Sequence, residues 1–144
     1  MNLSDTISAI ATPPGEGGIG IIRISGAGAE KIAKTIFKPG KNPPRRGIHV
    51  DSVKEEVFEN RRLYFGTVFN PSDNTPLDNA LMAIMRKPDS FTGEDVVEFH
   101  CHGGQLVLQR VLEAVLRQGA RLAEPGEFSK RAFLNSKMDL AQAE

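Results

Sequence analysis

The chain has 144 residues, of which 18 are lysine or arginine and 18 are aspartate or glutamate, so its formal net charge is zero. This length is typical of one compact domain. Hydrophobic residues make up 40% of the chain and charged residues 25%, a balance that excludes an intrinsically disordered or collagen-like protein. Zero net charge provides no general attraction to phosphate groups, which argues against a non-specific nucleic-acid coat protein.

Cysteine usage and the N-terminal sequence bear on the compartment. Cys101 is the only cysteine, so the sequence offers neither an intramolecular disulfide nor a cysteine-rich zinc site. The first residues lack the basic and apolar regions of a secretory signal, and no segment approaches the roughly 18 apolar residues of a membrane span. We therefore expect a cytoplasmic protein without membrane contact.

The first 60 residues predict two strands, a helix and a long connection. Residues 6–12 alternate as in a strand, and the β-branched residues 19–25 are typical of a buried strand. Residues 29–37 place apolar side chains on one helical face, with Ser25 as the expected cap and Pro39-Gly40 as the end. Residues 38–60 hold prolines and mixed charges, which indicates a long surface connection.

The middle of the chain predicts a hairpin, a strand and a long helix. Residues 63–69 and 80–85 flank the turn-forming residues 70–76, a pattern that predicts a β-hairpin with a long loop. Residues 96–102 predict a further strand. Residues 105–118 predict a helix with a broad apolar stripe, formed by Leu106, Leu108, Val111, Leu112, Val115 and Leu116.

The last 25 residues predict a short strand at residues 120–123 and a helix at residues 128–134. Asp139 is expected to cap one more helix, which has barely begun at Glu144. A helix of one turn is unstable alone, so we expect the sequence to be a fragment of a longer protein. The order of strands and helices predicts an α+β fold with a mixed sheet rather than a doubly wound one.

Glycine-rich and phosphate-binding motifs give little support for nucleotide binding by this chain. Residues 15–20 match G-x-G-x-x-G, but strand-forming residues follow where a dinucleotide site needs a helix. The segment is better interpreted as a connection between two strands. No G-x-x-x-x-G-K-[ST] motif occurs, so we expect no GTP hydrolysis by these residues alone.

Three polar residues of the 96–102 strand allow a metal site. Glu98, His100 and His102 share one face because side chains alternate along a strand, and two histidines with a carboxylate suit iron or zinc. Cys101 points to the opposite face, as a small core residue would. A small metal-dependent enzyme that uses Glu98, His100 and His102 is therefore the alternative to the function inferred below.

Two opposite charges lie within apolar strands, at Arg23 and at Glu98. A buried guanidinium is costly unless it is paired or faces a ligand. Two explanations of Arg23 have equal weight: it forms an ion pair with Glu98 or lies at a sheet edge, or it binds an anion. A carboxylate that accepts two parallel N–H donors, together with an arginine that fixes an anionic group, suits a heteroaromatic acid.

Basic residues gather in two further places. Lys38, Lys41, Arg45 and Arg46 lie in the proline-rich connection without interleaved aromatic residues, which favours a solvated loop over an RNA contact. Lys130, Arg131 and Lys137 are typical of a solvated helix face.

Four segments, taken together and in order, resemble the N-terminal region of the MnmE (TrmE) family of tRNA modification GTPases. The resemblance is carried by residues 5–26 with D-T-I, A-T-P-P-G and G-G-I-G-I-I-R-I-S-G, by S-F-T-G-E-D at 90–95, by H-G-G at 102–104 and by P-G-E-F at 125–128 continuing to Gln142. It implies a folate-binding and dimerisation domain, similar to the folate-binding domain of the glycine-cleavage T-protein, at residues 1–119. Residues 120–144 would then be the connection and first helices of a truncated helical domain.

The resemblance also implies the wider function. Such proteins act with a flavin-dependent partner of the MnmG (GidA) type, as a heterotetramer, to add an aminomethyl-type group at C5 of the wobble uridine of tRNA. The tRNA would be bound by the complex, and the chain would form a homodimer. GTP, Mg²⁺ and K⁺ would belong to a GTPase domain absent from this sequence, and the full-length protein would be an enzyme acting on GTP.

Three residues match the family's folate contacts, namely Arg23, Glu98 and Lys137. The resemblance implies that they bind 5-formyl- or 5,10-methylene-tetrahydrofolate, with Glu98 accepting the paired N–H donors of the pterin and the two cations near the formyl oxygen or the glutamate carboxylates. It implies no catalytic residue and no metal ligand in this fragment.

Overall fold

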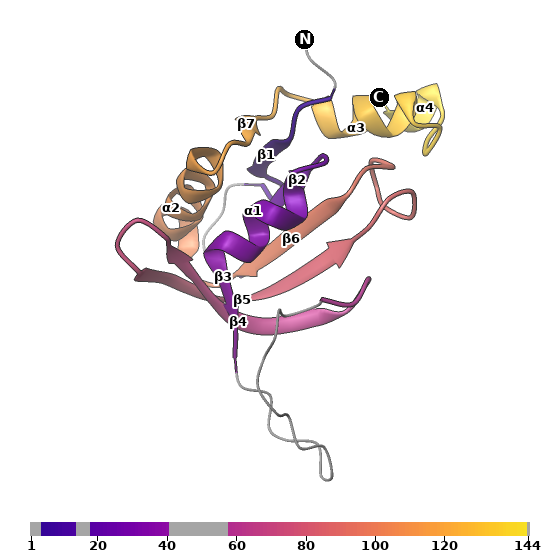
Figure 1. Ribbon diagram of the computed structural model, residues 1–144. Helices are drawn as coiled ribbons and strands as arrows, with labels where there is room; N and C mark the ends of the chain where they lie inside the picture. The colour runs from indigo at the N-terminus through magenta and orange to yellow at the C-terminus, as the bar shows by residue number, and fades with distance from the viewer. Residues whose placement is uncertain (1–3, 14–17, 41–57, 144) are drawn as a thin grey trace.

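The computed structural model describes residues 4–13, 18–40 and 58–143 and contains one mixed β-sheet (Figure 1). Its strands lie in the order β3-β4-β5-β6-β2-β1-β7. Among these strands β7 pairs with β1 in parallel and the other pairs are antiparallel. The bounds are β1 Ile7–Ile10, β2 Gly20–Ser25, β3 Phe37–Pro39, β4 Leu63–Asn70, β5 Thr75–Met85, β6 Val96–Cys101 and β7 Arg121–Leu122. The predicted α+β fold with a mixed sheet is confirmed.

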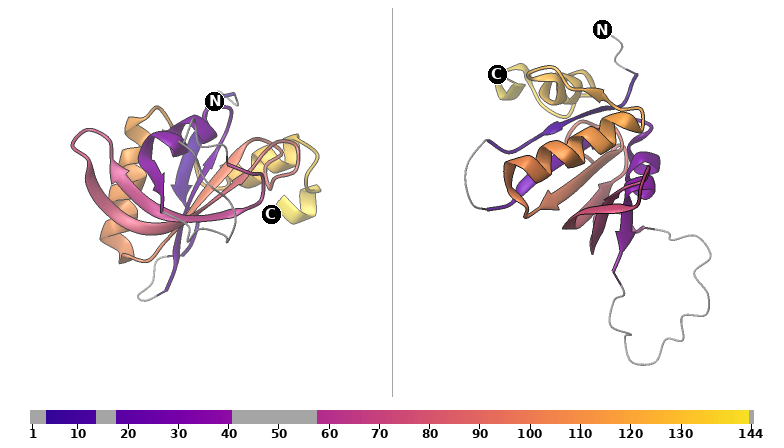
Figure 2. Two further views of the ribbon diagram at one scale, coloured as in Figure 1. Left: turned by 60° about the horizontal axis from the view of Figure 1, so that its bottom comes forward. Right: turned by 90° about the vertical axis from the view of Figure 1, so that its left-hand side faces the viewer.

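The helices occupy two regions (Figures 1 and 2). Helices α1 (Ala29–Ile36) and α2 (Gly104–Arg117) pack on the same face of the sheet and share its apolar core. Helices α3 (Glu127–Leu134) and α4 (Leu140–Ala143) follow β7; α3 lies beside the start of β1, and α4 contacts α3. In the described part of the chain, no helix has the length and apolar character that crossing a membrane requires.

Strand alternation decides which side chains enter the core. Ile22 and Ile24 of β2, with Val97 and Phe99 of β6, point toward α1 and α2 and are fully buried. Arg23 lies between the two isoleucines and therefore faces the other side of the sheet. This opposite side, which we call the outer face, carries the candidate site.

The glycine-rich segment at residues 15–20 connects two adjacent antiparallel strands, as predicted. Gly20 begins β2, so no helix opens at the last glycine and the dinucleotide-binding interpretation is wrong. Residues 14–17 lie outside the described residues.

The helix predicted at residues 29–37 is present as α1, but its last residue and its N-cap differ from the prediction. It ends at Ile36, because Phe37 turns into β3 and pairs with Val68. Its N-cap is Gly28, with no side-chain cap. The expected cap, Ser25, instead bonds to the side chains of Thr92 and Glu94. Of the predicted surface connection, residues 41–57 lie outside the described residues.

The hairpin of β4 and β5 is confirmed, but its loop is shorter than predicted. Strand β5 already begins at Thr75, so only residues 71–74 lie between the strands. The turn-forming residues act locally, since Asn70 accepts a hydrogen bond from the Ser72 amide and Asp73 from the Thr75 amide. A register shift between Val68 and Phe69 allows the paired strand to continue past Pro76.

The C-terminal segment is tied to the sheet. Strand β7 pairs with β1, and Ala132 of α3 is fully buried. Arg131 is only 1% exposed, so the predicted solvated face of α3 is wrong at this residue. Asp139 caps α4 as predicted, because its carboxylate accepts the Gln142 amide while the Gln142 side chain accepts the Asp139 amide.

Candidate functional site

The candidate site is a row of residues that crosses four strands on the outer face. Arg23 of β2 lies opposite Ala9 of β1 on one side and Glu98 of β6 on the other, and Glu98 lies opposite Ala83 of β5. Directly opposite residues share a face, so Arg23 and Glu98 project side by side from neighbouring strands. Strand register thus joins two residues 75 positions apart in the sequence.

Both oxygens of the Glu98 carboxylate have partners. The Nε of Arg23 lies 2.9 Å from Oε2, and the Nε2 of His100 lies 3.3 Å from Oε1. Neither Arg23 nor Glu98 is fully buried, so the pair remains within reach of solvent. The ion pair that the sequence allowed is therefore present, and it lies where a ligand on the outer face can reach it.

Two aromatic rings flank the guanidinium of Arg23. Its Cζ lies 5.2 Å from the ring centroid of Phe91, in the β5–β6 loop, and 5.5 Å from that of Phe128 on α3. Such distances are typical of cation–π contacts. The same residues line a cavity of about 380 Å³, which we call the Arg23 cavity, together with Ala9, Ala11, Glu124 and Pro125.

Lys137 lies in a second cavity of about 380 Å³, which we call the Lys137 cavity. Phe91 also lines this cavity, as do Arg61 and Ala83, the β5 residue opposite Glu98. The structure therefore brings Arg23 and Glu98 into contact and places Lys137 in the adjoining cavity. The role of these three residues in binding a folate stays a prediction.

The proposed metal triad does not form. His102 lies beyond the end of β6, where its amide donates to Asp78 and its Nδ1 lies 3.1 Å from the Asn79 carbonyl. Glu98 and His100 remain together without it, and no three histidine, cysteine, aspartate or glutamate side chains in the described ranges are grouped as metal ligands. The alternative of an enzyme built on these three residues is therefore wrong in its geometry.

Cys101 lies on the core side, as predicted from strand alternation. It is buried beneath the helices, and this burial raises the pKa of its thiol to about 12. A thiol of that pKa is protonated at neutral pH and has little nucleophilic character.

A buried network fixes the loop that carries Phe91. The Ser25 hydroxyl lies 2.7 Å from the hydroxyl of Thr92 and donates to Glu94 over 2.8 Å. The Asn135 side chain donates to the Thr92 carbonyl from the far side of the loop. The loop is therefore held between β2 and the end of α3.

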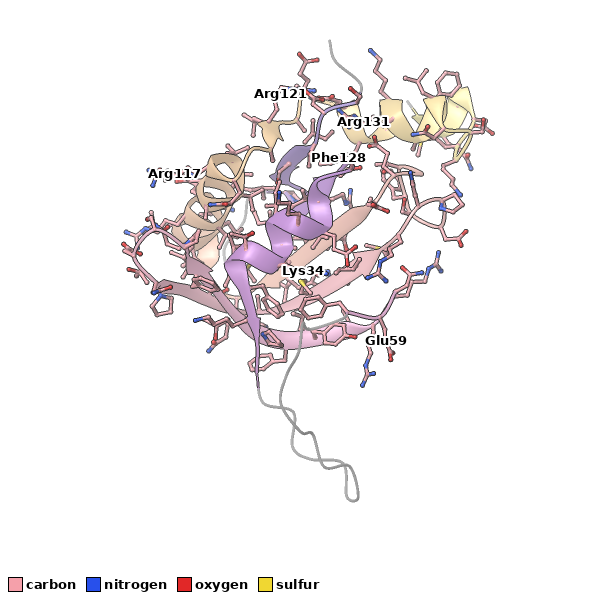
Figure 3. All side chains as sticks on the ribbon, viewed as in Figure 1. Lys34, Glu59, Arg117, Arg121, Phe128 and Arg131 are labelled. Carbon is pink, nitrogen blue, oxygen red and sulfur yellow. The ribbon has the colours of Figure 1, made fainter. Side chains whose placement is uncertain are left out.

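Five charged side chains connect the residues before β1, the β5–β6 loop, β7 and α3, namely Asp5, Glu94, Arg121, Glu127 and Arg131. Figure 3 labels the two arginines. Arg131 pairs with Asp5 at 2.8 Å, with Glu94 at 3.1 Å and with Glu127 at 3.2 Å. Arg121 pairs with Asp5 and Glu127, at 2.7 Å each. Hydrogen bonds from Arg121, supported by Arg131, lower the pKa of Asp5 and that of Glu127 to about 2.

Sequence reasoning missed the parts of the site that depend on loops. In the sequence, Phe91 and Phe128 stand out only as members of motifs shared with the resembling family, because no local pattern connects either ring to Arg23. Arg131 has the spacing of a surface residue on α3, and its partner Asp5 is 126 positions away. A further cavity of about 370 Å³, lined by Arg131 and Lys87, contains none of the three predicted folate contacts.

Comparisons with known proteins give one consistent result. A family model described as GTP-binding protein TrmE N-terminus matches residues 6–137. The chain is 54% identical over 142 residues to the tRNA modification GTPase MnmE of Heliobacterium modesticaldum, an alignment that covers 99% of this chain and 28% of that protein. The corresponding proteins of Carboxydothermus hydrogenoformans and Moorella thermoacetica are 50% and 52% identical, with 99% of this chain and 29% of each protein covered. The chain therefore spans less than a third of the length of these relatives.

Proposed function

This chain belongs to the family of TrmE N-terminal regions, and on that premise we propose that it is the folate-binding and dimerisation part of a tRNA modification GTPase. The observation that supports folate binding most strongly is the partly exposed Arg23–Glu98 pair on the outer face. Arg23 lines one cavity, and Glu98 lies opposite Ala83, which lines the other. Resemblance to the folate-binding domain of the glycine-cleavage T-protein is part of the same proposal.

The chemistry of the row suits a reduced folate. A pterin ring presents neighbouring N–H groups, and the two oxygens of one carboxylate accept a pair of such donors. In the free protein, these oxygens are occupied by Arg23 and His100. A bound ring would replace these donors, and Arg23 would become available to a formyl oxygen or a carboxylate.

Lys137 supplies the second cation of the proposal. It lines the cavity next to Glu98, so a ligand ring at Glu98 would have a carboxylate-bearing chain within its reach. Arg61 and Asp89 line the same cavity, so it holds two cations and one carboxylate. We propose 5-formyl- or 5,10-methylene-tetrahydrofolate as the ligand, with Arg23, Glu98 and Lys137 as its polar contacts.

For the whole protein we propose the activity that its relatives' name states, tRNA modification coupled to GTP hydrolysis. In this proposal a cytoplasmic complex with a flavin-dependent partner of the MnmG type adds an aminomethyl-type group at C5 of the wobble uridine. The folate would be associated with the one-carbon unit. GTP, Mg²⁺ and K⁺ would act in a GTPase domain outside this sequence.

The division of the chain into residues 1–119 and 120–144 is part of the same proposal. Residues of the second part pack on the first, since β7 pairs with β1 and Arg131 with Asp5.

Calorimetric titration with 5-formyl-tetrahydrofolate tests the folate site. We expect the wild-type chain to bind and Glu98→Ala to lose most of the affinity, because two charge-assisted hydrogen bonds of about 1.5–3 kcal/mol each lose their acceptor. The matched control is Glu113→Ala, which removes an exposed carboxylate of α2 that pairs only with Arg117 among the contacts described. Equal affinity of wild type and Glu98→Ala would remove Glu98 from the site.

A further inference from the structure

Phe91 is an exposed aromatic residue in an otherwise anchored loop. The residue is 42% exposed, whereas the next residue, Thr92, is fully buried. Large apolar side chains that remain exposed beside polar groups are typical of binding surfaces. The position of this ring therefore needs a functional explanation.

Phe91 separates the two cavities of the outer face. It is the one residue of the described chain that lines both the Arg23 cavity and the Lys137 cavity. Glu98 lies between Arg23 and Ala83 in the cross-strand row, and these two neighbours belong to different cavities. A ligand that contacts both Arg23 and Lys137 must therefore pass the ring of Phe91.

The anchoring of the loop limits how Phe91 can respond. Ser90 donates a hydrogen bond to the Glu94 carbonyl, and Thr92 is bonded to Ser25 and Asn135. These bonds hold the main chain on both sides of Phe91. The ring can therefore move by side-chain rotation while the loop stays in place.

The present partner of the ring is the guanidinium of Arg23. This flat cation lies within cation–π distance of Phe91 and of Phe128. Because an aromatic face accepts a flat conjugated ring as readily as a flat cation, a heteroaromatic ligand at Glu98 would offer Phe91 an equivalent partner.

We propose that Phe91 is the stacking residue of the site: its ring separates the two cavities in the free protein and turns to lie against the flat pyrimidinone part of the reduced pterin held by Glu98. This inference rests on the proposed function, since it assigns a specificity-determining contact for the same ligand. The side chain selects for the planar, conjugated pyrimidinone part of the pterin, while Lys137 meets the charged chain of the ligand.

Because the sequence contains no tryptophan, a single introduced tryptophan can report ligand stacking by its fluorescence. In Phe91→Trp, the indole is the only one in this 144-residue chain and reports stacking as quenched fluorescence. Phe133→Trp is the matched control, because Phe133 is exposed to nearly the same extent, 41%, and lines none of the cavities described above. The probes are 5-formyl-tetrahydrofolate, pterin-6-carboxylate as the ring alone, and glutamyl-glutamate as the charged chain alone.

We expect both ring-containing probes to quench Phe91→Trp at concentrations that leave Phe133→Trp unchanged, and glutamyl-glutamate to quench neither. Calorimetry should show that Phe91→Leu binds 5-formyl-tetrahydrofolate about three- to tenfold more weakly than wild type, the size of an aromatic stacking contribution. Wild type and Phe91→Leu should bind glutamyl-glutamate with the same affinity.

The outcomes separate this inference from the function on which it rests. If wild type binds 5-formyl-tetrahydrofolate but both tryptophan variants are quenched alike and Phe91→Leu keeps full affinity, Phe91 is not the stacking residue and the folate site stands. If wild type binds no folate at any attainable concentration, the proposed function and the stacking role are both overturned.

Discussion

At the scale of single residues, Arg131 is a charged side chain that is almost completely buried. It is buried against Asp5, Glu94 and Glu127, and a charge in that position is stable only while its partners are present. We predict that Arg131→Met lowers the free energy of unfolding by about 3–5 kcal/mol, because three carboxylates lose their shared cation.

Urea denaturation at pH 7 measures this loss. The control is Arg117→Met, which removes an exposed arginine whose ion-pair partner among the described residues is Glu113, four positions earlier on α2. It should cost at most about 1 kcal/mol. Equal losses for the two variants would show that the Arg131 network contributes no more than a surface ion pair.

The same network predicts how stability depends on pH. Hydrogen bonds from Arg121 lower the pKa of Asp5 from 3.8, and that of Glu127 from 4.5, to about 2 in the folded chain. Between these values the unfolded chain binds more protons, so the free energy of unfolding falls as the pH falls from about 4.5 to 2 and is unaffected by these groups above that window. Urea midpoints across the window should fall less steeply in Glu127→Gln, and Glu113→Gln should match wild type. A wild-type midpoint that stays constant from pH 5 to pH 2.5 would contradict the pKa shifts.

Sequence reasoning reached some of these residues and not others for a physical reason. Arg23 and Glu98 stand out because a charge between apolar residues of a strand is visible in the local alternation. The burial of Arg131 depends on Asp5 and Glu94, which approach α3 only after the sheet and the β5–β6 loop have formed. The spacing of apolar and charged residues within α3 therefore could not predict that Arg131 is buried.

At the scale of elements, the period of apolar residues was sufficient to find the main strands and helices. It did not find β3, because three residues are too few to show alternation, and it overestimated the hairpin loop because Pro76 is accommodated within β5. Both differences arise from strand pairing, which contacts distant in sequence decide.

Close approach of β3 to β4 gives an element-scale prediction. A Cβ added at Gly66 would overlap the Lys38 carbonyl oxygen and lie 2.6 Å from the Phe37 ring, so Gly66→Ala must displace β3. We expect a loss of about 1–3 kcal/mol in urea denaturation. Gly40→Ala is the control, since its Cβ would lie at an ordinary 3.4 Å from the Phe65 carbonyl oxygen. If Gly66→Ala is as stable as wild type, β3 can be displaced without lowering the free energy of unfolding, which would contradict the prediction.

At the scale of the whole molecule, the outer face leaves apolar residues uncovered beside the candidate site. Leu63 and Phe65 of β4 are more than half exposed, and burying such side chains stabilises a two-fold dimer. We predict dimers in sedimentation equilibrium, with and without folate, and a shift toward monomers in Phe65→Glu. Leu106→Glu, an equally exposed position on α2, should remain dimeric. A monomer mass at all concentrations would contradict the dimer, and growth without limit would indicate non-specific association.

The most direct test of the central claim is a crystal structure of the chain with 5-formyl-tetrahydrofolate. The proposed function predicts the pterin ring at Glu98, with both carboxylate oxygens accepting its N–H donors, and the glutamate chain directed toward Lys137. It also predicts that Arg23 faces the ligand instead of bonding only to Glu98. A ligand bound elsewhere, such as the cavity beside Lys87 and Arg131, or an unchanged Arg23–Glu98 pair at saturating ligand, would contradict it.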